Sequence, residues 1–289
     1  MILQFLINGL ITGILYALLA IGFSLVYNTT RIFHIAAAAL YVIAAYAFYF
    51  LSNRIGLSFL ISIVGAVAFT MLMSLLVELL IYRPLKRKKA SLNVVMIASI
   101  GVMTVLVNLV AMFFGNETKV IDNSIQRTIM YGDIIITTPQ MYQLLGGGAV
   151  ILFFILFICY SRWGVQFRAL SSDEILFEVL GYRMKQTRSF VFLLSGTFIA
   201  LASCLTVYDV GLDPNMGMNV LINAMVVMII GGVGRFNACI LGGLLLGILQ
   251  SLVVYQFASN WQNAITFLAL LFFLFLRPQG ILGYKQRTV

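Results

Sequence analysis

Arg162 to Arg188 reads RWGVQFRALSSDEILFEVLGYRMKQTR, a stretch that combines several cations with a short amphipathic pattern. It lies between two apolar runs, 140–160 and 187–208, each long enough to cross a hydrocarbon core of about 30 Å as a helix. A charged stretch between two such runs is expected to face water, because charges are costly in lipid. We therefore interpret it as a loop that joins two membrane helices.

The ends of a loop helix are marked within this stretch. Ser171 followed three residues later by Glu174 matches a capping box, and Asp173 with Glu174 favours the positive end of a helix dipole. Gly181 can adopt the left-handed conformation that stops a helix. The sequence therefore predicts a short surface helix from about Ser171 to Gly181.

One side of this predicted helix is apolar. Leu176, Phe177 and Leu180 are expected to share a face, while Glu174 and Glu178 line another. A helix of this kind, held by two membrane spans, can transmit force from a soluble motor into the bilayer. It can equally fold back on its own domain, and the periodicity alone favours neither alternative.

Composition sets the class of the protein. Of the 289 residues, 62% are hydrophobic and 9% are charged, and the mean hydropathy is +1.05. This leaves too few charged side chains to cover a soluble globule of this size. Helices satisfy their own backbone groups in lipid. We therefore predict an all-α polytopic membrane protein, surrounded by membrane lipid, with a single domain over residues 1–289.

The net charge of +9 is concentrated next to the apolar runs, so nucleic acid is not expected as a partner. Cations cluster at 83–89, within 162–188 and at 277–287, which are predicted to be cytoplasmic by the positive-inside rule. The long polar connection 116–139 has few cations and is predicted to be extracellular. Its Ile134–Thr138 run could form a short strand.

The apolar runs that we interpret as spans are 5–27, 33–51, 57–82, 92–115, 140–160, 187–208, 219–233, 238–256 and 262–276. Nine crossings that end inside require the N-terminus to start outside. The seventh run is short and leads into Gly231–Gly234, where glycines break a helix, so a re-entrant segment would reduce the count to about eight. Gly243 and Gly247 have the small-xxx-small spacing of a helix-packing surface.

Side chains able to perform chemistry are scarce within the spans. His34 is the only histidine, and Glu78 lies near the cytoplasmic end of its run, within reach of Arg83. An ion-driven carrier or an intramembrane enzyme needs ionisable groups or metal ligands at depth. The cysteines show no metal-ligand spacing. We predict no catalytic residue and no metal site, and keep a secondary carrier, an intramembrane enzyme and a receptor without flux as rival hypotheses.

No Gly-Lys pair occurs anywhere, so the chain lacks a P-loop, and any ATP that drives it must be bound by another chain.

Short motifs follow one another in a fixed order along the chain. The first half holds Asn8-Gly9-Leu10, Gly13, Tyr16-Ala17-Leu18, Ala20-Ile21-Gly22, Tyr82-Arg83-Pro84-Leu85, Ile97-Ala98-Ser99-Ile100-Gly101 and Asn108. The second half holds Gly164, Arg168-Ala169, Leu180-Gly181, Ser195-Gly196, Pro214, Gly217, Gly231–Gly234, Gly242-Gly243, Gly247 and Arg277–Gly283. In order and spacing they resemble the permease subunits of bacterial ABC importers of the branched-chain amino acid type, a family that includes urea and amide permeases.

The resemblance implies a division of labour. It implies a type II ABC importer-like fold in the bacterial inner membrane, a second permease subunit, related or identical, and an extracellular or periplasmic substrate-binding protein. Two cytoplasmic ABC ATPase subunits would use ATP and Mg, and this chain would bind no cofactor itself. Segment 162–188 would be the coupling segment, with these residues at the ATPase: Ser171, Ser172, Asp173, Glu174, Leu176, Phe177, Leu180 and Gly181.

The cargo implied by the resemblance is a small polar solute, namely branched-chain or other amino acids, with urea, amides or another small solute as the alternative. Polar or aromatic groups in or near the spans are candidates for lining the pathway, although each could instead serve helix contacts: Asn8, Tyr16, His34, Tyr41 and Asn108. Where the family usually has Asn-Phe-Ala-His-Gly-Glu, this chain has His34–Ala39, with two polar side chains replaced by alanine. The coupling segment also departs from the usual Ala-Glu-Asn-rich sequence, which favours a dedicated ATPase.

Overall fold

The computed structural model describes residues 2–121, 128–131 and 134–283. The first part of the chain forms α1 (Ile2–Thr30), α2 (Ala37–Tyr49), a π-helical turn (Phe50–Arg54), α3 (Phe59–Val77), a second π-helical turn (Glu78–Tyr82), α4 (Arg83–Arg87) and α5 (Leu92–Phe114). The middle of the chain forms β1 (Thr128–Tyr131), β2 (Ile134–Thr137), α6 (Thr138–Tyr160), α7 (Arg162–Ser172) and α8 (Glu174–Val179). The last part forms α9 (Met184–Val210), α10 (Met216–Gly231), α11 (Ala238–Gln256), a 3₁₀ turn (Ser259–Trp261) and α12 (Gln262–Leu276).

Among the described residues, seven helices are long and apolar enough to cross a membrane. One of them runs continuously from Phe59 to Arg87 through α3, the second π-helical turn and α4. The two remaining predicted runs are occupied by α2 and α10, with 13 and 16 residues. The prediction of an all-helical polytopic protein is therefore confirmed.

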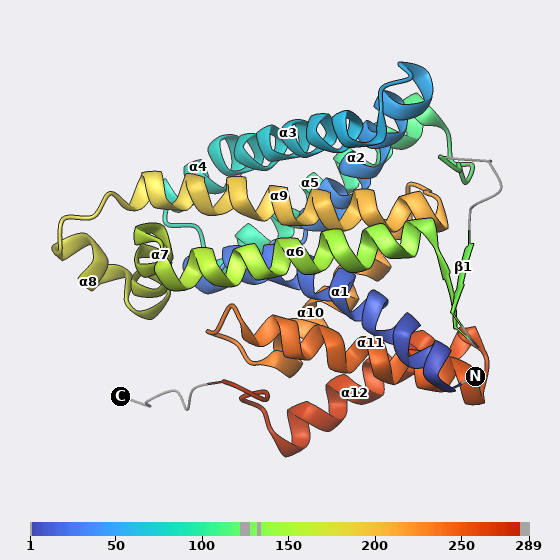
Figure 1. Cartoon of the computed structure of the whole chain (residues 1–289). Coiled ribbons are helices and arrows are strands. Elements are labelled where there is room, and N and C mark those ends of the chain that lie inside the picture. Colours follow the sequence, from blue (N-terminus) through green and yellow to red (C-terminus); the bar gives the residue numbers. More distant parts are fainter. Residues whose placement is uncertain (1, 122–127, 132–133, 284–289) are drawn as a thin grey trace.

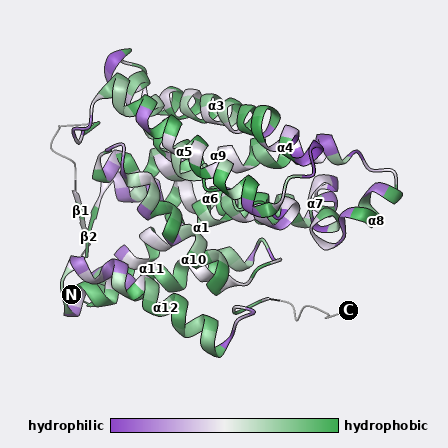
Figure 2. Ribbon diagram, turned by 180° about the vertical axis from the view of Figure 1, so that it is seen from behind, coloured by the Kyte–Doolittle hydropathy of each residue, from purple (hydrophilic) through white to green (hydrophobic). Residues whose placement is uncertain are grey.

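The bundle has two chemically different ends joined by an apolar middle. Figure 1 shows α4, α7 and α8 at one end, with the β1–β2 hairpin and the N-terminal end of α1 at the other. In Figure 2 hydrophilic segments gather at these two ends and hydrophobic ones lie between them. This is the arrangement that the cation clusters predict, with the hairpin end outside and the α7–α8 end inside. We call them the outer and inner ends.

The predicted strand in the polar connection is present. β2 pairs antiparallel with β1, Thr128 opposite Thr137 and Tyr131 opposite Ile134. Thr137 ends the strand and caps α6, because its side chain and that of Gln140 form a reciprocal capping box. The hairpin therefore leads directly into the sixth helix.

Glycines let α1 and α11 approach closely at the centre of the bundle. A Cβ atom at Gly13 would lie 2.8 Å from the Cα of Leu244, and one at Gly243 would lie 2.7 Å from the backbone nitrogen of Ala17. Both distances are too short for a real side chain, so only glycine fits. The predicted small-residue packing surface is confirmed, and α1 is its partner.

The glycine run after α10 forms a turn at the inner end. α10 ends at Gly231, Gly232 and Gly234 have φ angles of +117° and +100°, and α11 begins at Ala238. The backbone of Ile281 and Leu282 donates hydrogen bonds to the carbonyls of Ile230 and Gly231, at 2.8 and 2.9 Å. The run therefore connects α10 to the antiparallel α11 and is held by the C-terminal segment.

Candidate functional site

The helix predicted from Ser171 to Gly181 covers only the last residues of α7, a break at Asp173 and the short helix α8. Ser161 caps α7, whose last residue is Ser172. Asp173 then adopts an extended conformation, and its Oδ1 accepts hydrogen bonds from the backbone of Ile175 and Leu176, at 2.8 and 3.0 Å. The prediction that Ser171 caps the helix was wrong. The carboxylate two residues later is the better cap, because it accepts two orphan N–H groups at once.

The apolar side chains of α8 point in two directions, so the prediction of one shared face was also wrong. Phe177 is buried at 1% exposure and stacks on Tyr182 with ring centroids 5.0 Å apart. It fastens α8 to the turn that follows, where Gly181, with φ +82°, ends the helix as predicted. The other apolar side chains are open to solvent: Ile175 77%, Leu176 54%, Val179 77% and Leu180 63%.

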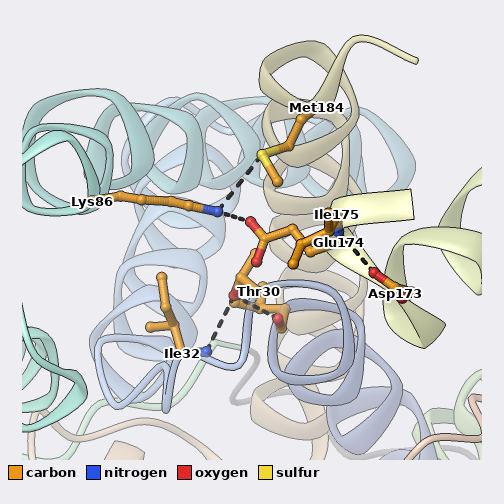
Figure 3. A network of polar contacts seen from close by, with 8 residues as sticks. Thr30, Ile32, Lys86, Asp173, Glu174, Ile175 and Met184 are labelled. Carbon is orange, nitrogen blue, oxygen red and sulfur yellow. Dashed lines mark hydrogen bonds and ion pairs between the residues drawn. The ribbon is translucent and has the colours of Figure 1, made fainter. Parts of the chain in front are cut away.

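Polar contacts connect α8 and the end of α7 to the bundle. Figure 3 shows the Glu174 carboxylate paired with the Lys86 ammonium of α4, which also contacts the Met184 sulfur at the start of α9. Arg31, just after α1, donates a hydrogen bond to the Ser171 carbonyl at 3.3 Å. Side chains next to the inner ends of α1, α4 and α9 therefore meet the two short helices.

A buried charged cluster lies beneath these contacts. Glu78 is 1% exposed and pairs with Arg83, Nε to carboxylate oxygen 3.5 Å, as its place in the sequence suggested. Arg83 also donates to Ser189 at 2.9 Å, which links the start of α4 to α9. The buried Arg188 guanidinium nitrogens find no hydrogen-bond partner among the described residues.

A cavity of about 440 Å³, lined by both polar and apolar side chains, occupies the outer half of the bundle. Helices α1, α2, α6, α9, α10 and α12 contribute its walls. The described lining residues are Asn8, Ile11, Thr12, Leu15, Tyr16, Leu19, Tyr41, Gln140, Gln143, Ala202, Thr206, Asp209, Val210, Val220, Asn223 and Gln262.

A hydrogen-bonded network joins four helices beside this cavity. Tyr16 donates to Gln250 at 2.9 Å, and Gln250 donates to Thr266 at 2.6 Å. Asn223 donates to Tyr16 at 3.3 Å and accepts from Thr266 at 3.2 Å. Gln250, Asn223 and Thr266 are buried, and each bond satisfies a polar group that apolar surroundings would otherwise leave unpaired.

The structure brings together only part of the predicted pathway set. Asn8, Tyr16 and Tyr41 line the cavity. His34 lies elsewhere. It is fully buried just before α2, and its Nδ1 is 2.8 Å from the hydroxyl of Tyr82, the last residue of the second π-helical turn. Asn108 is exposed on α5 and lines a separate cavity of about 210 Å³.

Several polar residues of the cavity and its network escaped the sequence analysis. Gln143, Asp209, Asn223, Gln250 and Thr266 each lie inside or at the edge of an apolar run. Their signal was polarity at intramembrane positions, and the three-residue spacing of Gln140 and Gln143 places both on one face of α6. Only the tertiary packing shows that these residues from different helices meet.

Comparison with known proteins agrees with the motifs. Residues 5–275 match the family described as branched-chain amino acid transport system / permease component. The high-affinity branched-chain amino acid transport system permease protein BraD of Pseudomonas aeruginosa is 28% identical, over 98% of this chain and 96% of that protein. LivH of Escherichia coli, a permease protein with the same description, is 26% identical over the same shares.

More distant relatives share the whole length as well. The probable branched-chain amino acid transport permease protein LivH of Methanocaldococcus jannaschii is 23% identical, over 98% of this chain and 93% of that protein. Among solved structures, PsaBC from Streptococcus pneumoniae in complex with Fab is similar in fold, with a TM-score of 0.56 and 17% identity over 96% of this chain and 93% of that chain. The chain thus belongs to the branched-chain amino acid permease family and is a multi-pass permease component of the bacterial inner membrane.

Proposed function

We propose that this permease carries branched-chain amino acids inward and receives its energy through α8 from two cytoplasmic ATPase subunits, which bind ATP and Mg. The observation that carries the proposal is the uncovered apolar side of α8, where Ile175 and Val179 are each 77% exposed at the inner end. Apolar side chains exposed together on a water-facing helix fit a groove on a soluble partner.

Motion of α8 has a physical route into the bundle. The Lys86–Glu174 pair attaches α8 to α4, and the stack of Phe177 on Tyr182 attaches it to the turn that enters α9. When the ATPase dimer closes on ATP, displacement of α8 would pull on both helices together. The coupling then depends on the two states of the ATPase dimer holding α8 in different positions.

A second permease subunit and a substrate-binding protein complete the proposed assembly. α5 supports the second permease subunit, because its span is largely uncovered and exposes Thr104 and Asn108, whose side chains, among the described residues, form hydrogen bonds with backbone carbonyls of α5 alone. Polar side chains are unfavourable on a helix surface that faces lipid, whereas they are suited to a pathway between two subunits. The binding protein would dock at the outer end, near the hairpin, and deliver the amino acid.

The test compares two equal substitutions within the coupling segment. Val179→Asp on α8 and Val165→Asp on α7 both replace an exposed valine, 77% and 53% exposed. In complexes reconstituted with the ATPases and the binding protein, Val179→Asp should abolish ATP-driven leucine uptake and loosen ATPase association, while Val165→Asp should retain most of both. Equal uptake by the two variants, or purification of the active assembly without any ATPase, would refute the proposal.

A further inference from the structure

The cavity between α1, α2, α6, α9, α10 and α12 opens toward the outer end, because several of its polar lining residues come from the outer ends of their helices. Gln140 lies in the first turn of α6, Asp209 is the next-to-last residue of α9, and Gln262 begins α12. Figure 1 shows these helix ends on the side of the β1–β2 hairpin. The volume of about 440 Å³ falls in the range of small-molecule sites.

The charge on the described lining of this cavity is negative. Asp209 is the single carboxylate among its described lining residues, and no described lining residue is cationic. The nearest polar partner of Asp209 is the Gln143 amide, 3.4 Å away, which makes its shorter bond, 2.9 Å, to the Leu205 carbonyl. The carboxylate thus keeps most of its capacity to accept hydrogen bonds. A lone negative charge at the mouth of a cavity with low-dielectric walls attracts a cationic group.

The rest of the lining includes hydrogen-bond donors and apolar side chains. Asn8 and Gln262 carry amide nitrogens that donate no hydrogen bond to any described residue, so they can serve an acceptor on a ligand. Apolar side chains also line the cavity, namely Ile11, Leu15, Leu19, Ala202 and Val220, and lie beside the polar groups of Tyr16, Tyr41, Thr206 and Asn223. One cavity therefore offers a site for an ammonium group, donors for a carboxylate and a surface for an aliphatic chain.

We propose that this cavity binds an aliphatic amino acid within a single permease subunit, with the α-ammonium group at Asp209 and the side chain against Leu15, Leu19 and Val220. The proposal rests on the function proposed above and adds a site to it. The permease then selects its cargo itself, in addition to any selection made by a binding protein. Tyr16 and Asn223, held by the network with Gln250, fix the shape of the inner wall.

The experiment measures binding of radiolabelled L-leucine to the purified full chain in nanodiscs, with no ATPase, binding protein or nucleotide. Wild type should bind saturably. Asp209→Asn should weaken binding about 10- to 100-fold, the size expected for loss of a charge-assisted hydrogen bond, and Asp209→Glu should restore part of it. Glu117→Gln, which removes an exposed carboxylate outside the cavity, should leave binding unchanged.

Two leucine fragments identify the group that Asp209 recognises. Isoamylamine keeps the ammonium and the branched chain, whereas 4-methylvalerate keeps the carboxylate and the branched chain. Isoamylamine should compete with leucine more strongly than 4-methylvalerate does in wild type. In Asp209→Asn the two compounds should compete equally. Equal competition by both compounds in wild type, unchanged binding in Asp209→Asn, or displacement by sodium chloride but not by isoamylamine would overturn the proposal.

Failure of this proposal is separable from failure of the proposed function. If no leucine binds to the isolated chain while the complete assembly still drives uptake with ATP, the site is absent and the coupling proposal stands. If the isolated chain binds leucine through Asp209 while no ATPase couples to α8, the site stands and the coupling proposal falls.

Discussion

Reversing the charge of Glu174 should weaken the link between ATP hydrolysis and uptake, because Glu174 is the carboxylate that ties α8 to Lys86 of α4. Glu174→Lys places two cations where the structure has an ion pair. The double change Lys86→Glu with Glu174→Lys re-creates the pair in the opposite sense. Glu178→Lys is the comparison within α8, since Glu178 lies on the same helix, carries the same charge and forms no ion pair within 4 Å of a described cation, although its charge acts on Lys86 from a greater distance.

The magnitude follows from the exposure of the pair. The side chains of Lys86 and Glu174 are 42% and 45% exposed, so solvent screens their attraction to about 0.2–1 kcal/mol. Glu174→Lys removes this attraction and adds a repulsion of similar size, a total of about 0.5–2 kcal/mol. At 1.4 kcal/mol per factor of ten, the population of correctly held α8 falls roughly 2- to 30-fold.

The assay is the number of leucine molecules imported per ATP hydrolysed by the reconstituted assembly. Glu174→Lys should lower this ratio within that range, the double variant should recover it, and Glu178→Lys should change it less. High salt should reduce the differences, because the pair is partly exposed. A double variant as defective as Glu174→Lys alone would refute the reasoning, since it would mean that Glu174 acts through some contact other than Lys86.

Two further predictions concern the bundle. Gln250→Leu should lower the thermal unfolding midpoint in detergent, by a free energy of about 1–3 kcal/mol, because Tyr16 and Thr266 lose their shared partner at bond lengths of 2.9 and 2.6 Å; an unchanged midpoint would contradict the network. Gly243→Val should abolish folding or lower the midpoint strongly, because the added atoms would overlap α1, whereas Gly148→Val on α6, where nothing lies within 4 Å of the added Cβ, should be tolerated; equal stability of the two variants would exclude the close α1–α11 contact.

The order of the apolar helices could be predicted from sequence, because a lipid-embedded chain must present runs of apolar residues of a length set by the bilayer. Their number was less well predicted: nine runs were interpreted as spans, whereas seven helices of the described residues are long and apolar enough to cross a membrane, since α2 and α10 are short. The cation clusters at 83–89 and 162–188 likewise indicated the inner end, since charge placement is local information. The motifs extended this to the permease family, and Gly181 was correctly predicted to end α8. The predicted N-cap was wrong. Ser171 and Asp173 are both suitable N-cap residues, and the extended backbone conformation at Asp173 decides between them.

What the sequence determined by itself is therefore membrane class, the order of the apolar helices and family, whereas the orientation stays a prediction from the cation clusters. Tertiary structure alone decided that Phe177 turns inward while Leu176 and Val179 stay uncovered, and that Asn8, Tyr16 and Tyr41 share a cavity while His34 and Asn108 do not. It also placed Asp209 opposite Gln143 and joined Gln250 to Tyr16, 234 residues away in the chain. The physical reason is that hydropathy and periodicity describe one helix at a time. A binding cavity exists only where faces of several helices meet, and their rotation is set by packing such as that of Gly13 against α11.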